Sequence, residues 1–269
     1  HPALKNRSEE EVSGYRDALE LVHAQGAKLP VSTETVRKLH QLCRGDIWDA
    51  GQYKDKQVDI IEKHPDGRET IRFRNVSPAE TPGCLQSAFA LWDEETKGHA
   101  IAPAIVMTAL NLDFLCIHPF RDGNGRVSRL LLLLTCYHLG IEVGRYISLE
   151  RLIEENKERY YETLKRSSQG WHEGNHDPWP YLGYLLFILK KAYDAFIERV
   201  RTFDSPKGEK TETIDRFLRQ TVDEFTVRDI QRACPGVSLD LIRRTLKARK
   251  ATGQVECLGM GRNARWRKM

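Results

Sequence analysis

The most informative segment of the chain reads His118-Pro-Phe-Arg-Asp-Gly-Asn-Gly-Arg-Val-Ser-Arg129. The apolar pattern before it predicts a helix that ends near Ile117, and a second apolar pattern predicts a helix that begins at Asn124. Glycines at a helix start let backbone N–H groups approach a ligand closely, and the first turn carries unpaired donors and a partial positive charge. The segment therefore predicts a phosphate-binding loop between two helices.

The charged side chains of this loop suit a ligand with several phosphate groups. Arg126 and Arg129 are three positions apart and so face the same side of the first helical turn; two guanidiniums indicate more than one phosphate. Asp122 stands among this positive charge, which Mg²⁺ bridging the phosphates would explain. His118 can accept a proton from a hydroxyl nucleophile. A lone histidine or arginine pair is more often structural or solvated, so it is the combination that indicates a functional site.

This segment resembles the signature of the Fic family, H-P-F-x-[DE]-G-N-G-R-x-x-R, and matches it at every specified position. The resemblance implies a mainly α fold with a Fic-type helical core. It also implies an enzyme that transfers AMP from ATP to a Ser, Thr or Tyr hydroxyl of a target protein, with pyrophosphate as the leaving group. The roles that it implies are a general base (His118), an anchor in the core (Phe120), a Mg²⁺ ligand (Asp122), an anion site (Gly123, Asn124, Gly125) and ligands of the outer phosphates (Arg126, Arg129).

The residue at position 125 distinguishes two branches of the superfamily that this motif resembles. Doc-type kinases resemble this motif but carry lysine at that position and transfer the γ-phosphate, so Gly125 favours AMP transfer. Transfer of UMP or phosphocholine stays open, because such a loop recognises phosphates and hardly contacts the base. The target protein and the modified residue are not indicated by the sequence.

The pattern around the motif predicts a helical domain with one hairpin. Two β-prone runs, Gln57–Ile61 and Thr70–Arg74, flank a Pro-Asp-Gly turn. The resemblance assigns residues 52–76 to a flap that would hold a target segment as an added strand; the alternative is a hairpin that only covers the core. Helices are predicted at residues 9–25, 33–43, 82–96, 102–116, 124–139, 148–167 and 178–200.

The predicted helix over 148–167 contains a second group of candidate residues. Asn156, Tyr160 and Tyr161 resemble the family's helix beside the adenine pocket. The two tyrosines are equally consistent with amphipathic core positions.

The sequence shows no clear match to the motif whose glutamate would block the nucleotide site. Fic enzymes that resemble this arrangement usually carry [ST]-x-x-x-E-[GN], whose glutamate pairs with the second arginine of the motif. No convincing copy is present. We therefore expect Arg129 to be free for the γ-phosphate and the protein to be active without an added activator. Self-modification and a glutamate from a second subunit of a homodimer stay open.

A break at residues 202–210 predicts two domains, a catalytic core over 1–201 and a small domain over 211–269. Helices at 211–221, 227–233 and 238–252, followed by strands at 255–258 and 264–267, form a winged-helix pattern. From Lys207 onward there are 15 Lys/Arg and 8 Asp/Glu, whereas the first 206 residues hold 27 and 30. An alternative function is therefore a DNA-binding regulator with a nucleotide-sensing core. A protein-docking module is equally open. The basic residues of this domain that could contact DNA phosphates are Arg243, Arg244, Lys247, Arg249, Lys250, Arg262, Arg265 and Arg267.

Composition places the chain among ordinary globular proteins, with 40% hydrophobic and 30% charged residues. The longest apolar run, Leu130–Leu134, is far shorter than the roughly 20 residues of a membrane span. Six cysteines without a C-x-x-C pair indicate free thiols in a reducing cytoplasm. We expect a cytoplasmic protein with no membrane partner.

Overall fold

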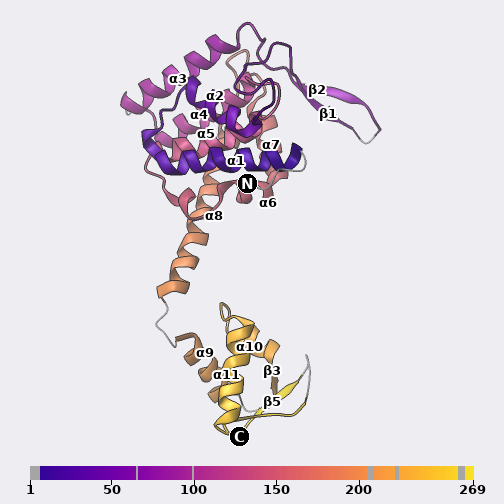
Figure 1. Ribbon diagram of the computed structural model, residues 1–269, viewed down its shortest axis with the longest axis vertical. Helices are drawn as coiled ribbons and strands as arrows, with labels where there is room; N and C mark the ends of the chain where they lie inside the picture. The colour runs from indigo at the N-terminus through magenta and orange to yellow at the C-terminus, as the bar shows by residue number, and fades with distance from the viewer. Residues whose placement is uncertain (1–6, 65, 99, 205–208, 222–223, 260–263) are drawn as a thin grey trace. The chain divides into compact units, whose positions relative to one another are not determined.

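The computed structural model describes residues 7–64, 66–98, 100–204, 209–221, 224–259 and 264–269. They divide into two compact units, one ending at Phe196 and the other running from Ile197 to Met269. The predicted mainly α fold is confirmed (Figure 1). No helix in these ranges combines the length and apolarity that a membrane crossing requires.

Helices that surround one buried helix make up the first unit. They are α1 (Arg7–Gln25), α2 (Thr33–Arg44), α3 (Thr81–Gly98), α4 (Pro103–Ile117), α5 (Asn124–His138), α6 (Leu149–Glu155), α7 (Lys157–Ser167) and the greater part of α8 (Trp179–Asp204), which continues past Phe196. Short 3₁₀ turns lie at Gly26–Lys28 and Val143–Arg145. The prediction of a single helix over 148–167 is wrong. The chain turns at Asn156, whose side-chain amide donates to the carbonyl of Leu152 at 2.7 Å and separates α6 from α7.

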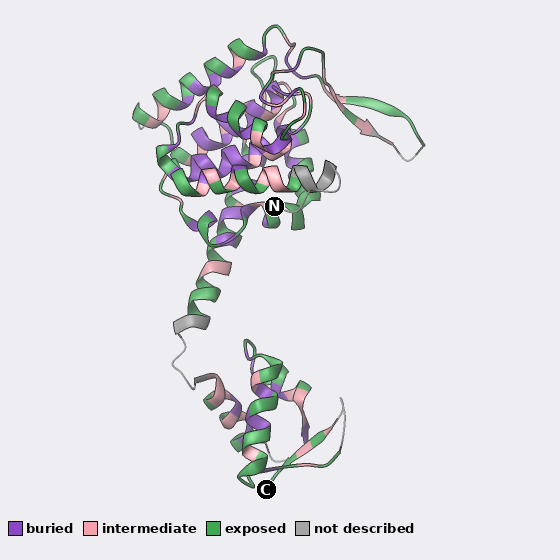
Figure 2. Ribbon diagram, viewed as in Figure 1, coloured by how far each residue is buried: buried purple, intermediate pink, exposed green. Residues whose placement is uncertain are grey.

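The buried helix is α5, which contacts α1, α2 and α4. Its residues Leu130, Leu131 and Leu134 have no exposed surface, and Figure 2 shows the buried positions concentrated in α4 and α5. Each such leucine contributes roughly 1.5–3 kcal/mol of hydrophobic free energy. Because α5 is fixed on all sides, the loop at its N-terminus rests on a rigid support.

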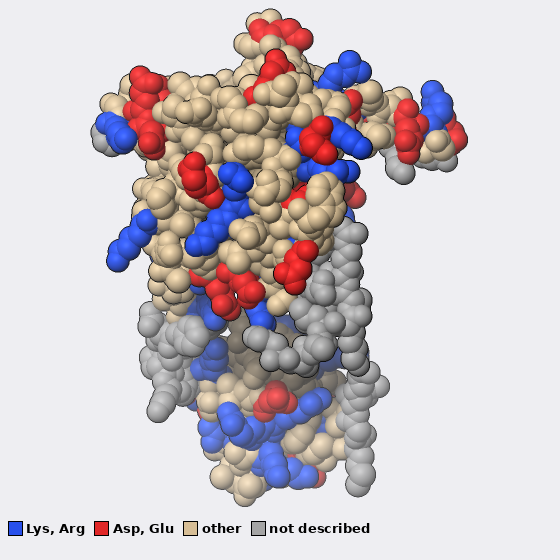
Figure 3. All heavy atoms as spheres, turned by 45° about the horizontal axis from the view of Figure 1, so that its top comes forward, with Lys and Arg blue, Asp and Glu red and all other residues tan. Residues whose placement is uncertain are grey.

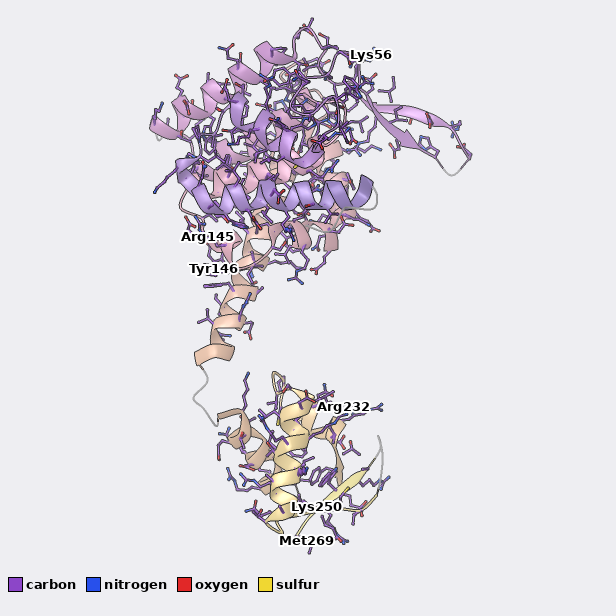
Figure 4. All side chains as sticks on the ribbon, viewed as in Figure 1. Lys56, Arg145, Tyr146, Arg232, Lys250 and Met269 are labelled. Atoms are coloured by element: carbon purple, nitrogen blue, oxygen red, sulfur yellow. The ribbon has the colours of Figure 1, made fainter. Side chains whose placement is uncertain are left out.

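The predicted hairpin is present as β1 (Ile60–Lys63) and β2 (Glu69–Phe73), an antiparallel pair that extends away from the helices in Figure 1. Lys56 marks the loop that leads into it (Figure 4). Gly67 has a φ of 84° in the connecting turn, a conformation that favours glycine. Ile61 and Ile71 pair across the strands, and both are about half exposed.

The second unit has its own small core. It contains α9 (Glu209–Gln220), β3 (Phe225–Thr226), α10 (Val227–Ala233), α11 (Leu239–Ala251), β4 (Val255–Cys257) and β5 (Arg265–Lys268). The strands form an antiparallel sheet in the order β3-β5-β4. Ile214, Ile230 and Ile242 are fully buried between the helices and this sheet.

Several local predictions for this unit can be compared with the structure. The side chains of Thr226 and Ser238 cap α10 and α11, whose ranges agree with the predicted helices to within a residue. Helix α9 begins at Glu209, two residues before the predicted start at residue 211. Strand β3 was not predicted, since two residues are too few for a visible alternation. The winged-helix assignment and the domain limits stay predictions; α8 continues to Asp204, into the predicted linker.

Candidate active site

His118 occupies the end of α4 in an unusual backbone conformation. Its φ of 53° is left-handed, and its N–H donates to the carbonyl of Phe114 at 3.0 Å. The ring nitrogen Nδ1 lies 3.3 Å from the carbonyl oxygen of Leu115. Because a carbonyl oxygen only accepts hydrogen bonds, this contact places the ring proton on Nδ1 and leaves the lone pair on Nε2. Burial lowers the pKa of His118 to about 4, so the imidazole is neutral near pH 7.

The loop after His118 is closed by Asn124. Its side-chain Oδ1 accepts from the N–H of Phe120 at 2.9 Å, and its Nδ2 donates to the carbonyl of Phe120 at 2.7 Å. Phe120 itself is fully buried. Both halves of the Asn124 amide are thus used within the loop, while its backbone N–H lies at the start of α5. Its role in the anion site stays a prediction.

His40 supports the loop from α2. Its ring stacks on Phe120 with centroids 3.8 Å apart. Nδ1 accepts from the N–H of Gly51 at 2.9 Å, so Nε2 carries the proton and donates to the carbonyl of Asp122 at 3.0 Å. A Cβ at Gly123 would meet the His40 ring at 3.3 Å, and Gly123 has a φ of 83°. The loop thus requires glycine at this position.

Arg44 holds the carboxylate of Asp122. Its Nη1 donates to Asp122 Oδ2 at 2.8 Å, while Nε and Nη2 bond to the buried carboxylate of Asp49. Asp122 Oδ1 accepts from the N–H of Gly123 at 2.6 Å. The Asp122 side chain is nevertheless 58% exposed. A carboxylate that a neighbouring guanidinium orients and that keeps more than half of its side chain exposed is suited to a metal ligand.

The N-terminus of α5 lies open beside this carboxylate. The N–H groups of Arg126 and Val127 bond back to the carbonyl of Gly123 at 3.1 Å. The N–H groups of Asn124 and Gly125 precede these bonds and lie at the open end of the helix. A Cβ added at Gly125 would lie 3.5 Å from Nη1 of Arg129, so this arginine reaches back over the first turn. The arrangement concentrates donors and positive charge where a phosphate would bind.

A cavity of about 350 Å³ opens next to the loop, between the hairpin and helices α4, α5 and α7. His118, Gly125 and Arg129 line one part of it, and the remainder is mostly apolar. Tyr160 and Tyr161 also line it, whereas Asn156 and Arg126 are not among its lining residues. The lining residues are Asp59, Ile60, Arg72, Phe73, Leu112, Leu115, Cys116, His118, Gly125, Arg129, Tyr160, Tyr161, Leu164 and Ser168.

Arg129 is paired, contrary to the expectation from the sequence. Its Nε lies 3.1 Å from Oε1 of Glu150 on α6, and the Tyr15 hydroxyl donates a hydrogen bond to the same glutamate. Burial opposes the charge of Arg129, but Glu150, together with Tyr15 and Tyr160, raises the pKa of Arg129 overall. The expectation was wrong because Glu150 belongs to no recognisable inhibitory motif and reaches the site only through helix packing.

Lys54 is a further residue that the sequence patterns did not indicate. It is buried, and its Nζ donates to the carbonyl of Ile117 at 2.8 Å, while its backbone N–H donates to the carbonyl of Pro119. Burial lowers the pKa of Lys54 to about 8. Both bonds hold the segment on either side of His118. The burial of His40, in contrast, could have been predicted from the sequence, because this residue falls within the apolar stripe of α2 beside Leu39 and Cys43.

Comparison with known proteins agrees with this geometry. A model of the Fic/DOC family matches residues 30–136, which include the loop. The protein adenylyltransferase Fic of Drosophila grimshawi is 22% identical over 190 residues, covering 70% of this chain and 35% of that protein. The chain thus spans about a third of the length of this curated relative.

Two solved structures share the fold. A Fic family protein from Desulfovibrio desulfuricans G20 aligns with a TM-score of 0.56 at 20% identity, covering 100% of this chain and 76% of that one. A Fic domain containing signaling protein from Bacteroides thetaiotaomicron aligns with a TM-score of 0.56 at 22% identity, covering 71% of this chain and 72% of that one. The motif, the Fic/DOC family match over residues 30–136 and the shared helical fold agree with one another and identify a Fic domain within this chain.

Proposed function

We propose that the protein transfers AMP from ATP to a Ser, Thr or Tyr hydroxyl of a target protein. The observation that carries this proposal is that His118, Gly125 and Arg129 line a single cavity. A proton acceptor, a helix N-terminus and a guanidinium then face the same space. The name of the Drosophila grimshawi relative, protein adenylyltransferase, supports the same activity.

In the proposed reaction the target hydroxyl oxygen attacks the α-phosphorus of ATP. A bond forms between them, the bond from that phosphorus to the oxygen bridging the β-phosphate breaks, and pyrophosphate leaves. The hydroxyl proton passes to Nε2 of His118, which carries the lone pair. The pKa of His118 is about 4 without nucleotide. The negative charge of bound ATP raises it and so makes the ring a better proton acceptor.

The outer phosphates would lie at the N-terminus of α5, where the backbone N–H groups of Asn124 and Gly125 and the guanidinium of Arg129 can bind them. Asp122 would hold Mg²⁺, which neutralises phosphate charge and orients the phosphate oxygens when bound. Within the described ranges no three His, Cys, Asp or Glu residues gather as a metal site. One carboxylate with phosphate oxygens and water suits Mg²⁺, which usually keeps such ligands.

The apolar part of the cavity would bind the adenine base of ATP. Leu112, Leu115 and Leu164 contribute aliphatic surface, and Tyr160 and Tyr161 contribute aromatic rings. Arg72 of the hairpin lies 6.0 Å from the centre of the Tyr161 ring. The hairpin thereby borders the nucleotide cavity, where an added strand of the target would bring its hydroxyl close to the α-phosphate.

Labelled ATP tests the proposal. ATP labelled at the α-phosphate should leave its label on protein, on this chain or on a protein in a cell lysate, whereas label at the γ-phosphate should be released. Retention of the γ-label instead would show phosphate transfer and contradict the proposal. Parallel reactions with UTP and CTP would show whether the cavity selects the base.

The variant His118→Ala should lower transfer by roughly 10²–10⁴-fold, because the proton acceptor is lost while the phosphate site remains. ATP binding should change little. The matched control is His138→Ala, at an exposed histidine in the last turn of α5, outside the cavity lining. Equal transfer by the His118 variant and the wild type would exclude this histidine as the base.

A further inference from the structure

Helix α11 of the second unit has two chemically different faces. Ile242, Thr245 and Leu246 are buried against the core of the unit. The remaining face carries exposed cations at positions three, four and seven apart, so they form a continuous stripe over two helical turns. These are Arg243, Arg244, Lys247 and Lys250, which are called the α11 cations below. Lys250 is labelled in the last turn of this helix in Figure 4.

Several other basic residues of the unit are held in ion pairs, whereas the one carboxylate along α11 is that of Asp240, three and four positions before Arg243 and Arg244. Arg249 pairs with Asp215 at 2.8 Å, and Arg265 and Arg267 pair with Glu224 and Glu256. Within the described part of the chain no ion pair involves an α11 cation. Figure 3 shows Lys and Arg side chains gathered on the visible face of this unit, with few acidic ones.

The shape of this surface distinguishes between possible anionic partners. The surface is the convex side of a helix. The cavity of about 410 Å³ in this unit is lined by other residues, among them Asp215, Leu218 and Val255. An acidic peptide needs a groove or pockets for its side chains. A helix of about 10–12 Å diameter fits instead into the major groove of B-DNA, which is about 12 Å wide.

We propose that the α11 cations bind the phosphate backbone of duplex DNA with α11 facing the major groove. Four cations spread over two turns would neutralise about four phosphates and release their counterions. The exposed carboxylate of Asp240 lies in the first turn of α11, away from Lys247 and Lys250 in the last two turns. The contact is with phosphates, so it gives affinity and carries no sequence preference by itself.

Fluorescence anisotropy of a labelled duplex, titrated with the whole chain at several NaCl concentrations, tests this proposal. The logarithm of the association constant should fall with the logarithm of salt concentration with a slope of roughly −4, about −0.9 for each phosphate. The double variant Lys247→Gln with Lys250→Gln should flatten the slope by about 2 and weaken binding severalfold at low salt.

The matched control is Lys28→Gln with Lys38→Gln, which removes the same charge from two exposed lysines of the first unit and should leave binding nearly unchanged. Absence of duplex binding at low salt, or equal loss in both double variants, would overturn the proposal. Binding of polyglutamate in place of duplex would overturn it in favour of an acidic protein partner. Circular dichroism checks that each variant is folded, and AMP transfer, which uses other residues, should be unaffected.

Discussion

Replacing Glu150 by glutamine should strengthen ATP binding. Glu150 pairs with Arg129 at 3.1 Å, and their side chains are 36% and 25% exposed. The carboxylate of Glu150 neutralises charge that Arg129 would otherwise offer to an outer phosphate, so the pair competes with the nucleotide. Glutamine keeps the shape of Glu150 and its capacity to accept from Tyr15, but removes the charge that holds Arg129.

The expected magnitude follows from the environment of the pair. Ion pairs with partly exposed side chains contribute about 0.2–1 kcal/mol, and the partial burial here places this pair near the upper value. At 1.36 kcal/mol for each tenfold change, removal of the competing charge should tighten the dissociation constant of ATP by up to about fivefold. AMP transfer at low ATP concentration should increase by a similar factor.

Isothermal titration calorimetry with ATP would measure the change. The control is Glu154→Gln on the same helix, because Glu154 is 72% exposed and pairs only with Lys157 among the described residues; its ATP affinity should equal that of the wild type. Weaker ATP binding by Glu150→Gln would refute the reasoning, because it would mean that Glu150 orients Arg129 toward the phosphates instead of competing with them.

Three further outcomes follow from the site. Asp122→Asn should raise the Mg²⁺ concentration needed for half-maximal transfer, measured by titration; an unchanged requirement would exclude Asp122 as the ligand. Gly123→Ala should destabilise the loop by roughly 1–2 kcal/mol and lower the melting temperature, because φ is 83° and the new Cβ meets the His40 ring at 3.3 Å. With the pKa of His118 lowered from 6.5 to about 4 by burial, kcat/KM should hold constant as pH falls through 6.5 and decline only as pH approaches 4; a decline centred near 6.5 would contradict the burial argument.

Local features could be predicted because they depend on a few neighbouring residues. The start of α2 at Thr33 and the hairpin turn that contains Gly67 follow from side-chain and backbone chemistry within four residues. The division between α6 and α7, in contrast, could not be predicted from the local pattern of residues. The apolar pattern continues through Asn156, and only the bond from its amide to Leu152 shows that the helix is interrupted.

The sequence by itself determined the Fic motif, the helical class and the order of the elements, because spacing along a helix and glycine conformations are properties of short segments. The tertiary structure alone decided which residues support and occupy the motif. His40 reaches Asp122 across 82 positions, Lys54 reaches Ile117 across 63, and Glu150 reaches Arg129 across 21. Such pairs form because packed helices bring distant residues together, and no pattern within a few turns encodes which residues will meet.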